Sequence, residues 1–180
     1  CQALCRMAAL AVANLRRLEM QLAQQRMEQD LAAAREAQEF MLPETQGQQE
    51  ACQWAYLFKP GRHASGDLVD IVPLPGRCVA LCVGDVSGKG AGAAILMAAS
   101  QSFLNASLVE TADPAAAVTA LNAFVTARSA LNKFLTLWVG IFHDGGMVEF
   151  VDAGHGYWAH VKADGVTVDD STLTTFANPG

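Results

Sequence analysis

The sequence lacks several features that would assign it to a class at once. No Cys-x-x-Cys pair is present: Cys1 and Cys5 are four positions apart, as are Cys78 and Cys82, and this spacing does not fit a zinc site. No apolar run approaches the roughly 18 residues of a membrane span, and no signal peptide is visible. The 12 Lys and Arg are outnumbered by 18 Asp and Glu, which argues against a nucleic-acid partner. We therefore expect a cytoplasmic protein with reduced thiols, no membrane span and no bound nucleic acid.

Glycine and proline are absent from residues 1–41. This segment is rich in good helix formers and predicts one long helix, which Pro43 ends. Two series of apolar residues with different helical phases lie along this segment. The first is Leu15, Leu18 and Leu22, and the second is Met27, Leu31, Ala34 and Met41. The pattern favours a parallel coiled coil that joins two chains into a homodimer. A single solvated helix is the alternative, and Gln25 and Gln38 weaken the apolar seam.

Residues 42–180 have a different pattern. Short apolar runs bounded by turn residues predict strands over 54–60, 68–74, 78–86, 134–143, 147–154 and 157–163. Residues 45–50 are polar and predict a loop, and Asp144-Gly145 predicts a hairpin turn. Two successive helices are expected, from Ala91 to about Val109 and from Pro114 onward. Helices grouped beside mostly antiparallel strands indicate an α+β fold rather than a doubly wound sheet.

Burial can also be predicted for these elements. Residues 78–86 are almost continuously apolar, so we expect a strand buried on both faces. The expected buried face of the first of these helices carries Ile95, Ala98, Ala99, Ser102 and Phe103. For the second helix, Asp113 is the expected N-cap before Pro114, and its apolar stripe carries Val118, Leu121, Phe124 and Val125.

A glycine-rich turn, "GDVSGKG", follows the strand expected at 78–86. It does not fit a phosphate-binding Walker loop, because Gly84 and Gly88 have three residues between them rather than four. Gly88, Gly90 and Ala93 match a short dinucleotide-binding pattern, which leaves a dinucleotide-binding domain as one alternative. The surrounding alternation of strands and helices that such a domain needs is missing.

Acidic residues at the strand ends suggest a cation instead. Asp85 ends one expected strand, and Asp67 begins another. Asp70 would point to the opposite side of that strand from Asp67. Neighbouring carboxylates repel one another, and a divalent cation relieves this repulsion. Each acid alone could equally be a solvated turn residue or a helix cap, so the metal hypothesis depends on the joint pattern.

That joint pattern resembles a known family. "ASGDLVD" (64–70), "GDVSGKGAGAAILM" (84–97) and "VDAGHGYW" (151–158) are similar to motifs of the SpoIIE/RsbU-type protein phosphatases of the metal-dependent PPM (PP2C-like) superfamily. "AREAQEFMLPE" (34–44) resembles the helix and Leu-Pro that precede this domain. Less specifically, the first helix resembles the exit helix of a GAF sensor domain. The resemblance implies an αββα sandwich and a bacterial signalling enzyme.

The resemblance also implies a mechanism and a set of site residues. Two divalent cations, Mn²⁺ or Mg²⁺, would activate a water that attacks phosphoserine or phosphothreonine, without a side-chain nucleophile. Asp85 would be the central ligand, with the Val86 carbonyl beside it and Asp67 as a second ligand. Gly88 and Gly90 would shape the turn. The role of Asp70 is unassigned, and His155 would hold the opposite segment or make a structural hydrogen bond.

The sequence departs from the family pattern in two ways. Asp152 replaces the usual Asn before Ala-Gly-His, which the pattern tolerates, and the later Thr-Asp-Gly motif, which supplies further ligands in the family, is absent. We therefore expect a fragment: a sensor exit helix and linker over 1–41, and the N-terminal part of a phosphatase domain over 42–180, inactive alone. The expected substrate is a phosphorylated protein of the anti-sigma-factor-antagonist type. The alternative is a catalytically dead phosphatase fold that acts as a dimeric interaction module.

Overall fold

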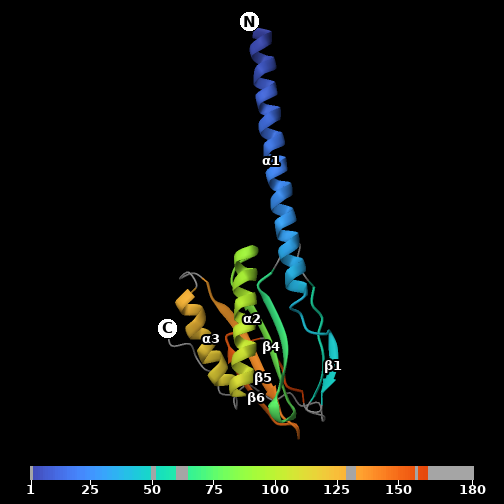
Figure 1. Ribbon diagram of the computed structural model, residues 1–180, viewed down its shortest axis with the longest axis vertical. Helices are drawn as coiled ribbons and strands as arrows, with labels where there is room; N and C mark the ends of the chain where they lie inside the picture. Colours follow the sequence, from blue (N-terminus) through green and yellow to red (C-terminus); the bar gives the residue numbers. More distant parts are fainter. Residues whose placement is uncertain (1, 50–51, 60–64, 129–132, 157, 162–180) are drawn as a thin grey trace.

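The computed structural model describes residues 2–49, 52–59, 65–128, 133–156 and 158–161 (Figure 1). The chain begins with α1 (Gln2–Glu39), a helix that extends away from the rest of the molecule as a stalk (Figure 1). The remaining elements are, in order, β1 (Gln46–Gln49), β2 (Cys52–Ala55), β3 (Asp67–Leu74), the short 3₁₀ helix η1 (Pro75–Arg77), β4 (Cys78–Val86), α2 (Ala91–Thr111), α3 (Pro114–Arg128), β5 (Leu135–Phe142) and β6 (Val148–Ala153).

The strands form two sheets. β3, β4, β5 and β6 are neighbours in that order and are all antiparallel, and β1 and β2 form a separate antiparallel hairpin. α2 and α3 lie side by side against one face of the larger sheet (Figure 1). This arrangement confirms the α+β prediction. The described strands contain no parallel βαβ unit, so the dinucleotide-binding alternative has no structural support.

The core lies between the two helices and the larger sheet. Its largest buried side chains include Leu68, Met97, Leu104, Leu108, Leu137 and Ile141. The stripe predicted for α3 is confirmed, since Leu121 and Val125 are buried and Phe124 stacks on Phe103 with ring centroids 4.5 Å apart. The face predicted for α2 is wrong. Ile95 is 70% exposed, and the buried face passes through Met97, Leu104 and Leu108 instead.

α2 bears on the expectation about membrane spans. Among the described residues it is the one helix long and apolar enough to cross a membrane by length and composition. That criterion alone is weak evidence, because core helices of globular domains meet it as well. α2 packs against β3 and α3, and its buried face includes the polar Ser100 and Gln101. These contacts explain why α2 is apolar: it is a helix of the core.

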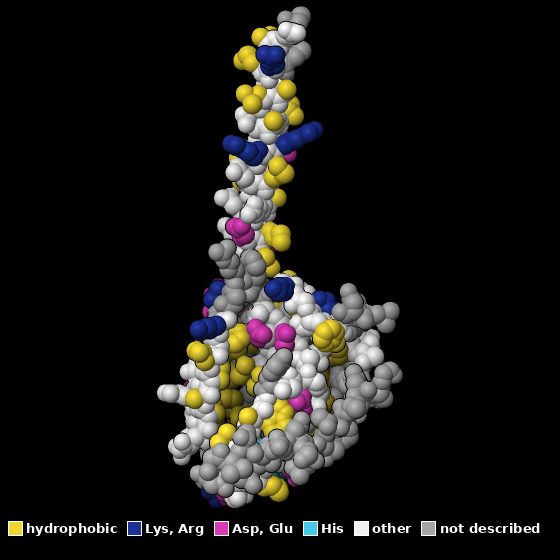
Figure 2. All heavy atoms as spheres, turned by 180° about the vertical axis from the view of Figure 1, so that it is seen from behind, with side chains coloured by type: hydrophobic (Ala, Val, Ile, Leu, Met, Phe, Trp, Pro, Cys, Tyr) yellow, Lys and Arg dark blue, Asp and Glu magenta, His cyan; other side chains and the backbone are white. Residues whose placement is uncertain are grey.

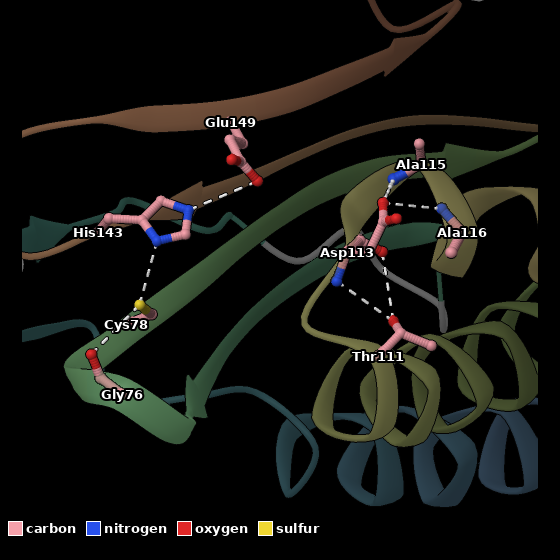
Figure 3. A network of polar contacts seen from close by, with 8 residues as sticks. All are labelled: Gly76, Cys78, Thr111, Asp113, Ala115, Ala116, His143 and Glu149. Atoms are coloured by element: carbon pink, nitrogen blue, oxygen red, sulfur yellow. Dashed lines mark hydrogen bonds and ion pairs between the residues drawn. The ribbon is translucent and has the colours of Figure 1, made fainter.

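Local turn and cap chemistry follows the sequence closely. The Asp113 carboxylate accepts hydrogen bonds from the backbone N–H groups of Ala115 (2.8 Å) and Ala116 (3.1 Å), so the N-cap prediction is confirmed (Figure 3). The hairpin predicted at Asp144-Gly145 joins β5 to β6, and the His143 N–H donates to the Met147 carbonyl at 2.9 Å. These features depend on residues adjacent in sequence, which is why they could be predicted.

The sheet end that carries Cys78 has its own polar contacts. Cys78 Sγ lies 3.3 Å from His143 Nδ1, and His143 Nε2 lies 3.6 Å from Glu149 Oε2 (Figure 3). Among the described cysteines, Cys52, Cys78 and Cys82 are free. The contacts join the start of β4 to the β5–β6 hairpin.

Three strand predictions need correction. The loop predicted at 45–50 contains β1, whose Gly47 pairs with Trp54 and lies against its indole ring. The strand predicted at 54–60 lies earlier, as β2. Trp158 to His160, within the strand predicted at 157–163, have no strand assignment, and Tyr157, Lys162 and Ala163 lie outside the described residues.

β4 is a central strand, but it is not buried on both faces along its length. Val83 is 38% exposed and Asp85 is also exposed, whereas Cys82, Gly84 and Val86 are buried against the helices. The described residues supply one helical layer and one four-stranded sheet, so the second face of β4 stays partly open near Asp85. This open face carries the candidate site.

Candidate metal centre

Asp67 and Asp85 form a cross-strand pair on the face of the sheet away from α2 and α3. Asp67 is the first residue of β3, and the antiparallel register places it directly opposite Asp85, near the end of β4. Both side chains are exposed, while their sequence neighbours Leu68, Gly84 and Val86 are buried. Figure 2 shows acidic side chains gathered on this face, below the base of the stalk. The strand register thus brings together the two acids that the sequence pattern singled out.

The electrostatics of this pair disfavour two negative charges. Partial desolvation and the neighbouring Asp67 carboxylate raise the pKa of Asp85, and His155 acts in the opposite direction. Like charges directly opposite one another on neighbouring strands destabilise a sheet. A bound cation would remove this repulsion, because it lowers the pKa of the carboxylates that hold it.

Close backbone packing fixes the distance between the two strands at this point. The Val86 N–H donates to the Gly66 carbonyl at 3.0 Å. A Cβ atom added at Gly66 would lie 2.4 Å from the Val86 carbonyl oxygen and 3.1 Å from Asp85 Oδ1. Only glycine therefore fits at position 66 without moving the strands. From the sequence, Gly66 is identified only as part of a motif.

The turn after β4 interacts with a positive group. Lys133 Nζ donates to the Ser87 carbonyl at 3.0 Å, and the Phe134 N–H donates to Ser87 Oγ at 2.9 Å. Gly88 has φ +101°, and a Cβ atom there would lie 2.4 Å from Lys133 Nζ. Sequence reasoning missed Lys133, because it lies 46 positions from Ser87 and no motif connects them. Gly90, with φ +82°, is the N-cap of α2.

Asp70 lies apart from this centre, on the helix-facing side of β3. The prediction that Asp67 and Asp70 face opposite sides is confirmed by the alternating burial of the strand. Asp70 is buried and accepts hydrogen bonds from Asn105 Nδ2 (3.2 Å) and from the Ile71 N–H (2.9 Å). Burial raises the pKa of Asp70, and these hydrogen bonds reduce the effect. Its contacts attach β3 to α2.

The raised pKa of Asp70 predicts a pH dependence of stability. A raised folded-state pKa adds stability below the ordinary value of about 4, and this contribution is lost as pH rises through the folded value. Asp70→Asn keeps the shape without the charge, and the Asn105 amide can rotate to supply an oxygen. The melting temperature of the variant, relative to the unchanged metal-free chain, should therefore be higher at pH 7 than at pH 4. An equal difference at both pH values would contradict a disfavoured carboxylate.

Asp152 lies near the end of β6, and His155 follows that strand. Asp152 is buried and accepts hydrogen bonds from the N–H groups of His155 (2.7 Å) and Gly156, and from Trp158 Nε1 (3.1 Å). Asp152 thereby organises the turn that carries His155. The His155 side chain lies near enough to influence the charge of Asp85, so the structure brings it into the neighbourhood of the acidic pair.

An apolar pocket lies on the same face of the sheet. It has a volume of 530 Å³, and its lining includes Val83, Trp138, Phe150, His155 and Trp158. The Phe150 ring lies 5.8 Å from Trp138 and 4.8 Å from Trp158, measured between centroids. The acidic pair and an aromatic surface are therefore neighbours.

The oxygen atoms at this site are of the kind that binds a divalent cation, but they are too few to complete its coordination. Carboxylate and carbonyl oxygens are the ligands that Mg²⁺ and Mn²⁺ prefer, and Asp67, Asp85 and the Val86 carbonyl supply them. Across the described part of the chain, no three His, Cys, Asp or Glu side chains group closely enough to hold a metal ion. The described residues therefore offer oxygen donors of a suitable kind, but fewer than a complete ligand set.

Comparison with known proteins identifies the family. No curated protein matches the chain. The sequence model of the family described as Stage II sporulation protein E (SpoIIE) matches residues 75–175, which is more than half of the chain. This range includes β4, the glycine-rich turn, both core helices and His155. The chain therefore belongs to the SpoIIE family of PPM-type phosphatases.

Proposed function

We propose that this chain carries part of a centre that hydrolyses phosphoserine or phosphothreonine on a signalling protein, with two divalent cations, Mn²⁺ or Mg²⁺, as cofactors. The observation that carries the proposal is the Asp67–Asp85 pair, two carboxylates held opposite one another on adjacent strands of a phosphatase-family domain. When bound, the cations would activate water and neutralise charge on the phosphoryl group.

The residues of the chain have separate roles in this proposal. Asp85, the Val86 carbonyl and Asp67 hold the cations. The Gly66–Val86 hydrogen bond keeps the two strands in register, and Lys133 fixes the Ser87–Gly88 turn. Two carboxylates are too few for two cations, so we propose that the remaining ligands come from outside the described residues.

The surface beside the acids favours a protein substrate. Aromatic side chains line the neighbouring pocket, and they can receive apolar residues that flank a phosphorylated side chain. We propose a phosphorylated protein of the anti-sigma-factor-antagonist type as the substrate.

The stalk favours a dimer. α1 exposes many large apolar side chains, among them Leu15 (60%), Leu18 (54%) and Leu22 (47%). We propose that residues 1–41 pair with a second copy in a coiled coil and carry a signal from a sensor domain. A dimer without catalysis, an interaction module with a phosphatase fold, is the second candidate function, and the same exposed residues support it.

One preparation can test the proposal against this alternative. The protein that contains this chain, together with residues that complete the ligand set, is incubated with a phosphoserine protein substrate. We expect phosphate release with Mn²⁺ and none with excess EDTA, and sedimentation should give the mass of two chains. A dimer that releases no phosphate at saturating Mn²⁺ would favour the interaction module. A monomer would contradict the role of the stalk.

A further inference from the structure

Gln38 differs from every other residue of α1 whose side chain the structure describes. The stalk residues are exposed or half-buried, whereas Gln38 is 7% exposed. A buried amide is costly unless its donors and acceptor have partners. Its partners therefore show what this position does.

Among the described residues, the hydrogen-bond partners of the Gln38 amide lie in Ser65–Asp67, where the chain enters β3. Its Oε1 accepts from the Ser65 N–H at 3.0 Å, and its Nε2 donates to the Ser65 carbonyl at 3.1 Å. Longer contacts of 3.4 Å join Nε2 to Ser65 Oγ and to the Asp67 carbonyl. β3 is at the edge of the described four-stranded sheet, and Gln38 pairs with the backbone just before it as a neighbouring strand would.

This segment leads directly to the acidic pair. Gly66, which follows Ser65, accepts the hydrogen bond from the Val86 N–H and packs against Asp85. Asp67 comes next in the chain. Gln38 therefore binds Ser65, which lies two residues before the proposed metal ligand Asp67. The residue between them, Gly66, is hydrogen-bonded to Val86, the neighbour of Asp85.

A second contact fixes the end of the stalk to the helical layer. Gln101 Nε2, on α2, donates to the Met41 carbonyl at 3.0 Å. The end of α1 is thus attached both to β3, through Gln38, and to α2, through Met41. With its end fixed in this way, a rotation or shift of the stalk must move the Ser65–Asp67 segment or break the bonds of Gln38.

We propose that Gln38 is a positioning residue that holds Ser65–Asp67 in register against Asp85 and Val86, and that the metal affinity of the centre depends on this contact. The second clause rests on the proposed function, and the first does not. The sequence pattern suggested instead that Gln38 weakens a coiled-coil seam. Its burial against the domain corrects that interpretation.

The test compares Gln38→Met with Gln25→Met in the metal-free chain. Methionine keeps the length of the side chain but makes no amide hydrogen bonds, and Gln25 is an exposed residue of the same helix. Amide hydrogen exchange at Val86 should become about tenfold faster in Gln38→Met, because the Gly66 carbonyl is no longer held in place. Exchange at Val139, in the buried centre of β5, should not change. Both amides should be unaffected in Gln25→Met.

A parallel measurement addresses the metal. Titration calorimetry with Mn²⁺ on the protein with a complete ligand set should give a Kd about tenfold weaker for Gln38→Met than for Gln25→Met, as for other residues that orient metal ligands. If Gln38→Met folds poorly, Gln38→Glu retains the acceptor for the Ser65 N–H and should give an intermediate effect in both experiments.

The two experiments test the positioning role of Gln38 and its link to the metal separately. Unchanged Val86 exchange in Gln38→Met would overturn the positioning role, and so would faster exchange shared equally by Val139. Faster exchange at Val86 with an unchanged Mn²⁺ affinity would overturn the link to the metal. If the unsubstituted protein bound no Mn²⁺, the proposed function would fail, while the exchange data would still decide the positioning role.

Discussion

Replacing Asp85 with asparagine should lower metal-dependent phosphate release by more than about a hundredfold. Residues that only orient a metal ligand already contribute about 10- to 100-fold in activity or metal affinity, and we assign Asp85 a direct bond to the cation. Asparagine keeps the shape but supplies only a neutral oxygen, so kcat/KM should fall at every Mn²⁺ concentration. The measurement is steady-state phosphate release from a phosphoserine protein, by the protein with a complete ligand set.

The stability of the same variant should change in the opposite direction. Because the pKa of Asp85 is raised, its ionised form is disfavoured in the folded chain, and at neutral pH this cost is present in the unsubstituted protein. Asp85→Asn removes the repulsion from Asp67, so the metal-free melting temperature should stay equal or rise. Loss of activity without loss of stability is the signature of a site kept for function.

Asp30→Asn provides the matched control. Asp30 lies on the stalk and is exposed, so the same chemical change there should alter neither phosphate release nor stability. If Asp85→Asn kept its rate within about tenfold of the unsubstituted protein, Asp85 would not be a metal ligand. A lower melting temperature would show that the carboxylate stabilises the fold.

The parts of the structure that could be predicted from sequence depend on short stretches of chain. The Asp113 cap, the Asp144-Gly145 hairpin and the placement of Asp85 at a strand end each follow from a few consecutive residues. The faces of Asp67 and Asp70 follow from the alternation of a strand. The two acids could therefore be placed on one side of the sheet before their partners were known.

The parts that could not be predicted depend on tertiary contacts. α2 is rich in alanine on every side, so its sequence pattern does not identify a buried face, and Ile95 is exposed while Met97 is buried. The polar strand β1 forms because its backbone pairs with β2, which no local propensity shows.

The same limit applies to the candidate site. Gln38 and Lys133 reach their partners across 27 and 46 positions. In a helix sequence, a glutamine among regularly spaced apolar residues is typical of a polar residue that weakens a coiled-coil interface. Only the fold shows that Gln38 faces the backbone of another segment.

Replacing Gly66 with alanine should destabilise the chain by about 2 kcal/mol or more and separate the two acids. An added Cβ would lie 2.4 Å from the Val86 carbonyl oxygen, a distance that the strands can relieve only by moving apart. That movement would stretch the 3.0 Å hydrogen bond from the Val86 N–H to the Gly66 carbonyl. Urea unfolding of the metal-free chain measures the cost, and Mn²⁺ titration of the protein with a complete ligand set should show weaker binding.

Gly92→Ala is the control for this substitution. Gly92 lies in the first turn of α2, and an added Cβ would have no heavy atom within 4 Å. Alanine there should stabilise the chain by up to about 1 kcal/mol, because it is the better helix former. If Gly66→Ala unfolded within about 0.5 kcal/mol of the unsubstituted chain, β3 and β4 could separate at this point at little cost. The pairing of Asp67 with Asp85 would then not depend on Gly66, and the register of the two acids would need another cause.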